Sequence, residues 1–415
     1  MRWFICIRYL LSHLRQTLVC IAGVVISVTM FVTMTAMMRG FTDKFIIETV
    51  ESTGHITIND EPRARQTPIL ETIYPDPNAL LELQGPKPRD VIEKIKNPTG
   101  LIATVRRMPL VVEASPIVKG DAVITYGNKT YAIVVEGVEP DRHVNVTTIG
   151  QKVTQGAFLR LKMTSDGIVL GRGVAITLGV KIDDLITVTS STGGKIIAKV
   201  VGIFSTGVTP VDYSRGYMQL TSAQTLLNKK NIVNEIVVRT SDYTRAREIA
   251  AQIEQISGYK TESWQEANEN FLKIFRIQTI ITYFITGALL VVAAFGVLNI
   301  LIMAVLERVN DIAILKSFGF SRADITQIYL LQGMVIGLIG SILGLIFGKI
   351  AVEGLRRVPI QMEGLIKADG LLMSEHLSQY VTAFFGAMAI VLLAAVYPAR
   401  RAARYDPVEV IRGAH

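Results

Sequence analysis

The side chains that most often carry catalysis are scattered along this 415-residue sequence. Its histidines are His13, His55, His143, His376 and His415, and neither an H-E-x-x-H nor a G-x-S-x-G motif occurs. A G-x-x-x-x-G-K-[ST] loop, whose backbone amides would hold nucleotide phosphates, is also missing. We therefore expect a chain that binds no metal or cofactor itself and that is not an enzyme.

The segment from Glu307 to Gly319 has the residue pattern of a contact with another protein. Charged and apolar residues alternate in it at helical spacing, and Gly319 can end the helix. A short amphipathic helix of this kind can insert Ile312, Leu315 and Phe318 into a groove on a partner. Periodicity alone favours the alternative, which is a loop on a membrane surface.

Membrane-spanning helices must position this segment. Half of the residues are hydrophobic and only 19% are charged, which is too apolar for a chain whose surface lies wholly in water. A span needs about 20 apolar residues in a helix. Four stretches meet this condition, namely 18–38, 277–306, 328–350 and 381–397. A cleaved signal peptide is the alternative for the first stretch, but its apolar core is long and no A-x-A site follows.

Lysine and arginine residues predict the orientation of these spans. They gather in segments 1–17, 307–327 and 398–415, so these segments and both termini are expected in the cytoplasm. Segments 39–276 and 351–380 then lie outside. Basic residues near the inner leaflet account for the net charge of +8, so membrane lipid is an expected partner and nucleic acid is not. Segment 1–17 is predicted to be an interfacial helix, with continuation of the first span as the alternative.

The external segment 39–276 is predicted to be a mixed α/β domain. Short β-branched runs and helical patterns follow one another in an order that suggests an α/β module with a β-rich module inserted at about residues 147–219. Residues 62–88 have the composition of an extended loop. Cys6 and Cys20 both lie near the amino end, so no disulfide is expected in this domain.

A stalk helix is predicted to join this domain to the second span. Ser263 and Glu266 have the spacing of a capping box, and no proline occurs from there to Gly319. A continuous helix from 264 to 309 is therefore expected, with two helices meeting near Arg276 as the alternative. The stripe that would pack on a partner helix consists of Trp264, Ala267, Phe271, Ile274 and Phe275.

The third span has small residues at helical spacing. Small residues let helix backbones approach closely in a membrane. We expect them to pack against a neighbouring span of the same subunit rather than to line a channel. They are Gly333, Gly337, Gly340, Ser341, Gly344 and Gly348.

Several stretches resemble a known family of permeases. The run ERVNDIAILKSFGFSRADITQIYLLQGMVIGLIGSILG and the tail YPARRAARYDPVEVIRG are similar to the signature of the FtsX superfamily, which includes lipoprotein-releasing (LolC/LolE-type) and macrolide-exporter-like ABC transporter permeases. The runs GIVLGRGVAITLGVKIDDLITV and SWQEANENFLKIF resemble the lipoprotein-releasing permeases. The resemblance implies four transmembrane helices and an external porter-like module with an inserted β-rich module, in the bacterial inner (cytoplasmic) membrane.

The resemblance also implies partners. Two permeases, this chain and a second copy or a paralogue, would assemble with a dimer of ABC ATPase subunits that bind ATP and Mg. The loop after the second span would be the coupling helix that is seated on the ATPase. The residues that match it are Glu307, Arg308, Asp311, Ile312, Leu315, Lys316, Phe318 and Gly319.

The function implied by the resemblance is mechanotransmission. ATP hydrolysis in the partner would drive the extraction or export of lipoprotein-like or other amphipathic cargo from the inner membrane. A periplasmic carrier or adaptor would be a further partner, but the hook that recruits it in one subtype is replaced here by a tight turn from Thr189 to Lys195, TSSTGGK. The alternative is a signalling member of the superfamily that activates a periplasmic partner without transport.

Overall fold

The structure, a computed structural model, describes residues 2–12, 14–60, 94–358, 361–363 and 367–406. Its contacts divide the chain into two compact units. We call Met1–Lys44, Lys273–Met362 and Ala368–His415 the helical unit, and Phe45–Leu272 with Glu363–Lys367 the sheet unit. The loop predicted at 62–88 and the end of the tail from 407 lie outside the described residues.

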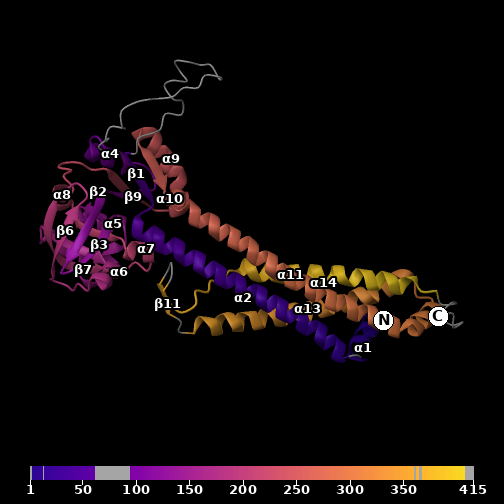
Figure 1. The fold of residues 1–415 in the computed structure, drawn as a ribbon. Coiled ribbons are helices and arrows are strands. Elements are labelled where there is room, and N and C mark those ends of the chain that lie inside the picture. Colours follow the sequence, from indigo (N-terminus) through magenta and orange to yellow (C-terminus); the bar gives the residue numbers. More distant parts are fainter. Residues whose placement is uncertain (1, 13, 61–93, 359–360, 364–366, 407–415) are drawn as a thin grey trace, which may run out of the picture. The chain divides into compact units, whose positions relative to one another are not determined.

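Four helices are long and apolar enough to cross a membrane, which confirms the predicted number of spans (Figure 1). They are α2 (Leu14–Thr53), α11 (Glu269–Glu307), α13 (Arg322–Arg356) and α14 (Leu377–Arg404). Each contains one of the predicted stretches and extends beyond it. Helix α14 continues through Pro398, so the first residues of the predicted cytoplasmic tail are helical.

Helix α1 (Arg2–Ser12) is separate from α2 and folds back on the helical unit. Arg2 contacts Asp324 and Gln327 in the first turns of α13. Helix α1 also exposes the large apolar side chains of Trp3 and Phe4. This amphipathic arrangement suits a helix at a membrane surface.

The expected continuous helix from 264 to 309 is interrupted twice. Helix α10 (Trp264–Ala267) ends at Asn268, where φ is −112° and ψ is 22°. Helix α11 ends before Arg308, where φ is −118° and ψ is 20°, and α12 (Val309–Ser317) follows. The alternative of a junction near Arg276 is also wrong, because α11 passes through that residue unbroken. The capping box of Ser263 and Glu266 is confirmed.

The sheet unit contains one ten-stranded mixed sheet in the order β10-β1-β9-β2-β3-β8-β5-β7-β4, with β6 paired to β2 and β7. Most neighbours are antiparallel, whereas β3 with β8 and β5 with β7 are parallel. The strands are β1 (Ile56–Asn59), β2 (Val111–Tyr126), β3 (Lys129–Val138), β4 (Val153–Gly156), β5 (Gly167–Gly171), β6 (Leu185–Ser190), β7 (Lys195–Phe204), β8 (Arg215–Gln219), β9 (Glu235–Thr240) and β10 (Lys260–Ser263).

Helices pack on this sheet and form hydrophobic cores with it. Helices α4 (Pro98–Val105) and α9 (Ala246–Ser257) pack on the end that contains β1 and β9. Helices α6 (Arg172–Leu178) and α8 (Leu220–Leu226) pack on the end that contains β3, β5 and β7. Two shorter helices, α5 (Pro140–Val146) and α7 (Thr209–Asp212), contribute to a third core with Phe204 and Tyr217.

The contacts mark no boundary for the inserted module predicted at about 147–219, because Phe45–Leu272 belongs to one unit. One core unites residues from Val118 to Leu227, including β3 and the second half of β2. Strand β2 belongs to two cores, because Ala114 packs beside β1 and β9 while Ile124 packs beside β6 and β7. The structure thus places β3 in the core of the β-rich part, although it precedes residue 147. A short pair of strands, β11 (Gln361–Glu363) and β12 (Lys367–Asp369), lies in the second predicted external segment.

The glycines of α13 form two contact stripes within the helical unit. A Cβ atom at Gly340, Gly344 or Gly348 would lie 2.8, 2.6 or 3.0 Å from the Cβ atom of Val24, Val28 or Val32 of α2 respectively. Gly333 and Gly337 instead face Ala395, Met388 and Val391 of α14. Ser341 is fully buried. Close backbone approach therefore holds α13 between two neighbouring helices.

Replacing Gly344 by alanine should destabilise the helical unit. The added methyl group would overlap Val28, and overpacking of this kind costs about 1–3 kcal/mol. The matched control is Gly296→Ala in α11, where an added Cβ meets no described atom within 4 Å. We expect a lower melting temperature in detergent for Gly344→Ala only. Equal melting temperatures for the two variants would contradict the close contact of α13 with α2.

Candidate functional site

The segment between α11 and α13 is a short, well-bounded helix. Helix α11 ends at Glu307, and Arg308 has non-helical backbone angles. Helix α12 follows from Val309 to Ser317. Gly319 has a φ of +94°, in the left-handed region that favours glycine, and thus ends α12. Ser321 and Asp324 then form a capping box that starts α13. The sequence therefore fixes both ends of this segment within a few residues.

The inner face of α12 packs into the helical unit. Ile312 is 1% exposed and contacts a cluster that includes Tyr329 and Ala399. Leu315 is half-buried against the same cluster. The expectation that Ile312 inserts into a partner is therefore wrong, because this side chain is already enclosed by its own chain.

The outer face of α12 presents a different set of residues. Phe318 is 81% exposed and Ile314 is 51% exposed. Glu307, Asp311 and Gly319 are also exposed. Because Asp311, Ile314 and Phe318 follow one another at intervals of three or four residues, they lie on one side of α12. The pattern of the sequence did not single out Ile314, since a residue's face is decided by what packs behind it.

Arg308 and Lys316 hold the segment in place. The Arg308 guanidinium lies 3.9 Å from the centre of the Tyr9 ring in α1, and it also donates to Ser12. The Lys316 ammonium donates to the carbonyl oxygens of Ala403 and Tyr405, each at 2.7 Å. Burial and the nearby Arg322 lower the pKa of Lys316. The Arg308 side chain thus fixes α12 to α1, and the Lys316 side chain fixes it to the end of α14.

Only some residues of the stripe predicted on the stalk helix pack against other side chains. In the sheet unit, Phe271 lies 5.3 Å from Phe45 of α2, and in the helical unit Phe275 lies 5.6 Å from Phe41 of α2. Trp264 is 7% exposed, and its indole N–H donates to the Tyr243 carbonyl oxygen at 2.8 Å.

Two members of the stripe are not buried. Ala267 is exposed, and Ile274 is 55% exposed. The helix that pairs with the stalk is therefore α2 of the same chain.

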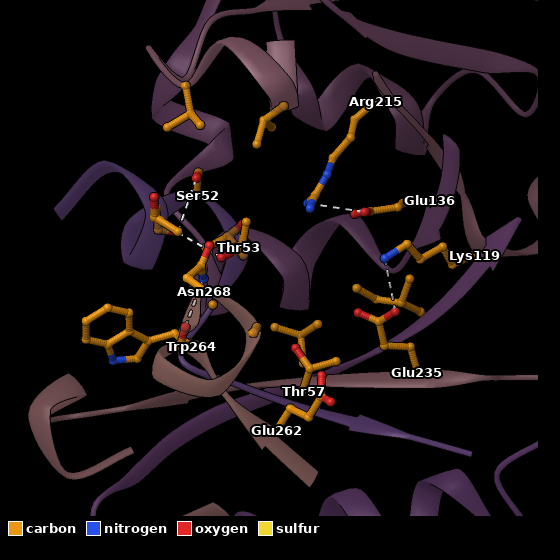
Figure 2. A pocket seen from close by; sticks show the side chains of 18 of the residues that line it. Ser52, Thr53, Thr57, Lys119, Glu136, Arg215, Glu235, Glu262, Trp264 and Asn268 are labelled. Carbon is orange, nitrogen blue, oxygen red and sulfur yellow. Dashed lines mark hydrogen bonds and ion pairs between the residues drawn. The ribbon is translucent and has the colours of Figure 1, made fainter. Parts of the chain in front are cut away.

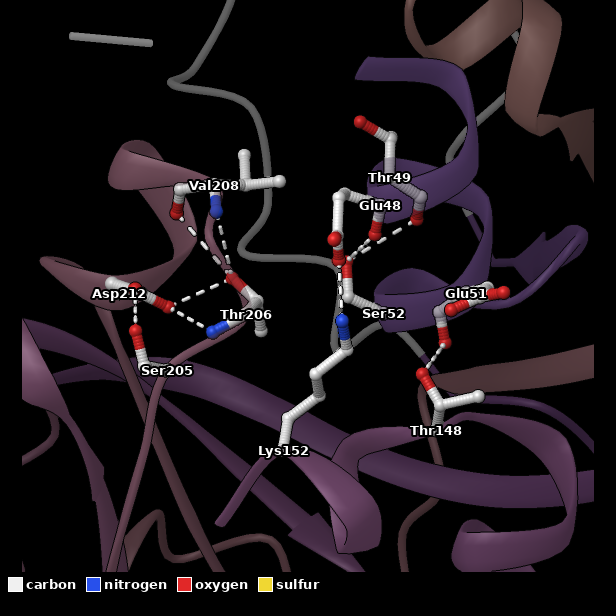
Figure 3. Close-up of polar contacts among 10 residues, drawn as sticks. All are labelled: Glu48, Thr49, Glu51, Ser52, Thr148, Lys152, Ser205, Thr206, Val208 and Asp212. Carbon is white, nitrogen blue, oxygen red and sulfur yellow. Dashed lines mark hydrogen bonds and ion pairs between the residues drawn. The ribbon is translucent and has the colours of Figure 1, made fainter. Parts of the chain in front are cut away.

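Polar contacts fix the last turns of α2 to the sheet unit (Figure 3). The Lys152 ammonium lies 2.6 Å from the Glu48 carboxylate, whose side chain is 8% exposed. The Thr148 backbone N–H and hydroxyl both donate to the Glu51 carbonyl oxygen. In the same view the Asp212 carboxylate accepts from the backbone N–H and the hydroxyl of Thr206, each at 2.7 Å. These contacts fix the turn before α7.

Two further features bear on ligands and partners. Among the described residues, no group of three histidine, cysteine, aspartate or glutamate side chains is placed to hold a metal ion. The turn between β6 and β7 is tight, since the Ser190 N–H donates to the Gly194 carbonyl oxygen at 2.8 Å and Gly193 has a φ of +88°. Nothing protrudes between these two strands.

Two protein-family models match the chain. Residues 17–256 match the MacB-like periplasmic core domain, and residues 283–407 match the C-terminal domain of FtsX-like permeases. The first match covers more than half of the chain, from the start of α2 to the end of α9. The second covers most of α11 and all of α12, α13 and α14.

Individual relatives match over similar lengths. The lipoprotein-releasing system transmembrane protein LolC of Neisseria meningitidis is 25% identical over 98% of this chain and 97% of its own length. LolE of Haemophilus influenzae is 28% identical over 74% and 79%. The macrolide export ATP-binding/permease protein MacB of Bartonella henselae is 23% identical over 96% of this chain but only 57% of its own length.

One solved structure is a distant likeness. The periplasmic region of MacB from Actinobacillus actinomycetemcomitans has a TM-score of 0.35 and 14% identity, over 54% of this chain and 95% of that structure. The assignment of the family depends on the sequence matches alone. With one model matched over more than half of its length and the other over its remaining helices, this multi-pass membrane chain belongs to the FtsX-like ABC transporter permeases that carry a MacB-like periplasmic core domain.

Proposed function

We propose that this chain is the permease subunit of an inner-membrane ABC transporter that releases lipoproteins or other amphipathic cargo, driven by a separate ATPase chain. The end-to-end match with LolC, over 98% of one chain and 97% of the other, carries this proposal. The MacB relative, described as an ATP-binding/permease protein, is covered over only 57% of its length. This sequence has no phosphate-binding loop, so the proposal assigns ATP binding to a separate chain.

The outer face of α12 is the proposed seat for the ATPase. Phe318 and Ile314 expose apolar surface that a groove in a partner would bury, and aromatic anchors of this kind often dominate interfaces. Arg308 and Lys316 would keep this face rigid through their bonds to α1 and to the end of α14. ATP and Mg would be bound by the partner. A second copy of this chain or a paralogue would complete the permease pair.

Helices α2 and α11 are the proposed carriers of motion. Both run from the helical unit into the sheet unit, and aromatic contacts pair them in each unit separately. Movement of α12 on ATP hydrolysis would act directly on α11, because only Arg308 separates the two helices. In this scheme segments 1–17, 307–327 and 398–415 are cytoplasmic and the sheet unit is periplasmic.

Replacing Phe318 or Ile314 by aspartate should uncouple the permease from its ATPase. Both side chains are exposed, so the changes should leave folding intact while removing apolar anchors from the interface. We expect cargo-stimulated ATP hydrolysis in proteoliposomes to fall by roughly tenfold or more. The matched control is Met163→Asp in the sheet unit, which is 90% exposed and should hydrolyse like the wild type. Normal hydrolysis in both α12 variants would remove this face from the ATPase contact.

Purification in mild detergent should co-isolate an ABC ATPase chain, which mass spectrometry would identify. Spheroplasts or proteoliposomes containing the complex should then release a lipoprotein only when ATP is added. The control uses a complex whose ATPase lacks its phosphate-binding lysine. ATP hydrolysis with no release of any lipid-anchored or amphipathic molecule would favour the signalling alternative, in which motion activates a periplasmic partner.

A further inference from the structure

A cavity of about 320 Å³ lies inside the sheet unit, where two helices meet the sheet (Figure 2). One wall comes from the last turns of α2 and from α10 with the start of α11. The other comes from β1, β2, β3, β8, β9 and β10. Its volume is at the lower end of the range of pockets that bind small molecules. None of the functional assignments above uses this cavity.

The charged groups of the cavity form ion pairs with one another. The Arg215 guanidinium lies 3.2 Å from the Glu136 carboxylate, and the Lys119 ammonium lies 3.6 Å from the Glu235 carboxylate. Figure 2 shows both pairs on the same side of the cavity. The third acid of the lining, Glu262, lies 2.7 Å from the Lys260 ammonium. A charged ligand would have to break one of these pairs or face a like charge.

The protonation state of the buried Glu136 carboxyl group is consistent with this pairing of charges. Burial alone would raise the pKa of Glu136, but the charges of Arg215 and Lys119 and a hydrogen bond from Tyr217 hold the pKa below its usual range. Glu136 therefore stays ionised beside Arg215. The lining holds two cations and three carboxylates, and each carboxylate has a cationic partner, since Glu262 pairs with Lys260 outside the lining. No charge in the lining is therefore left unpaired to attract an ion.

Two polar side chains in the lining have no partner among the described residues. Neither ring nitrogen of His143 is hydrogen-bonded, and the Thr49 hydroxyl accepts and donates no bond. Both residues are more than nine-tenths buried, at 2% and 6% exposed, and both line the cavity. Desolvation by burial lowers the pKa of His143 to about 4, so the ring is neutral and offers one donor and one acceptor. Buried polar groups without partners are rare and often mark a bound molecule.

Aromatic rings also line the cavity. Phe45 and Phe271 lie 5.3 Å apart between their ring centres, and Trp264 is a further aromatic residue of the lining. The indole N–H of Trp264 is already bonded to Tyr243, so its ring offers the cavity an apolar face. A ligand that fits must therefore combine an apolar face with uncharged donors and acceptors. A sugar ring has this combination, because its C–H face is apolar and its hydroxyl groups are neutral.

We propose that this cavity is a binding site for a neutral, hydroxyl- and amide-bearing ring compound of the size of an N-acetylated monosaccharide. Thr49 and His143 would hydrogen-bond its polar groups, and Trp264 and Phe271 would pack on its ring. The site contacts α2 and α11, the two helices that continue into the helical unit, so its ligand would act on the same elements as the proposed motion. Binding itself does not depend on the proposed function, since it needs neither ATPase nor cargo.

The test uses N-acetylglucosamine as the probe and the full chain in detergent. Trp3 and Trp264 are the two tryptophans of the sequence, so Trp3→Phe leaves Trp264 as the only indole reporter. We expect a saturable change in Trp264 fluorescence on titration with the probe. Thr49→Val and His143→Phe, made separately in this background, should each weaken the apparent Kd by roughly three- to tenfold. Thr130→Val, at an exposed position of β3, is the matched control and should leave the Kd unchanged.

Charged analogues of the probe test the electrostatic part of the argument. Glucosamine carries an ammonium group and glucuronate carries a carboxylate on a similar ring. Both should bind at least several-fold more weakly than N-acetylglucosamine, because the ion pairs leave no free charge. Equal or tighter binding of either analogue would overturn the neutral-ligand assignment. No saturable change with the probe, or the same Kd in Thr49→Val and the parent, would overturn the site, and the Thr49 variant decides this even if His143→Phe does not fold.

Discussion

The contact between α2 and α13 is the constraint on which the arrangement of the helical unit depends. In a membrane the hydrophobic effect does not drive helices together, so close packing has to supply the attraction. The absence of side chains at Gly340, Gly344 and Gly348 brings the backbone of α13 against Val24, Val28 and Val32. Two hydrogen bonds reinforce α2 from its neighbours, from Thr29 to the Gly344 carbonyl and from Ser27 to the Leu289 carbonyl of α11. Helix α2 is thus held on both sides before it enters the sheet unit.

Elements with a strong local pattern could be predicted from the sequence. The four apolar stretches and the capping box at Ser263 follow from periodicity or spacing within a few residues. The interruptions at Asn268 and Arg308 could not be predicted in this way, because neither residue forbids a helix. The sharing of β2 between two cores could not be predicted either, because it depends on which residues pack on each half of one long strand.

The roles of individual residues in the candidate site were also only partly predictable from local sequence patterns. Helical spacing identified α12, but it could not distinguish Ile312 from Ile314. What separates them is the cluster around Tyr329 and Ala399, which covers one side of the helix and comes from segments distant in sequence. Lys316 was likewise assigned to the contact with the ATPase, whereas its ammonium donates to two carbonyl oxygens near the end of α14. Half of the residues assigned to a partner therefore serve first to position the helix.

The buried ion pairs that line the cavity carry a desolvation cost. Burying a salt bridge seldom stabilises a fold, since desolvation cancels most of the attraction, and apolar residues of similar volume often do as well. The pair of Glu136 and Arg215 is therefore weak evidence for stability. It does fix the position of groups that line the same cavity as Phe271 and the last turns of α2, and apolar side chains packed together there would fill that space. A wall of balanced charges leaves a lined, uncharged cavity beside the two helices that connect the units. Binding of a ligand, rather than stability of the fold, best accounts for the polar residues at this position.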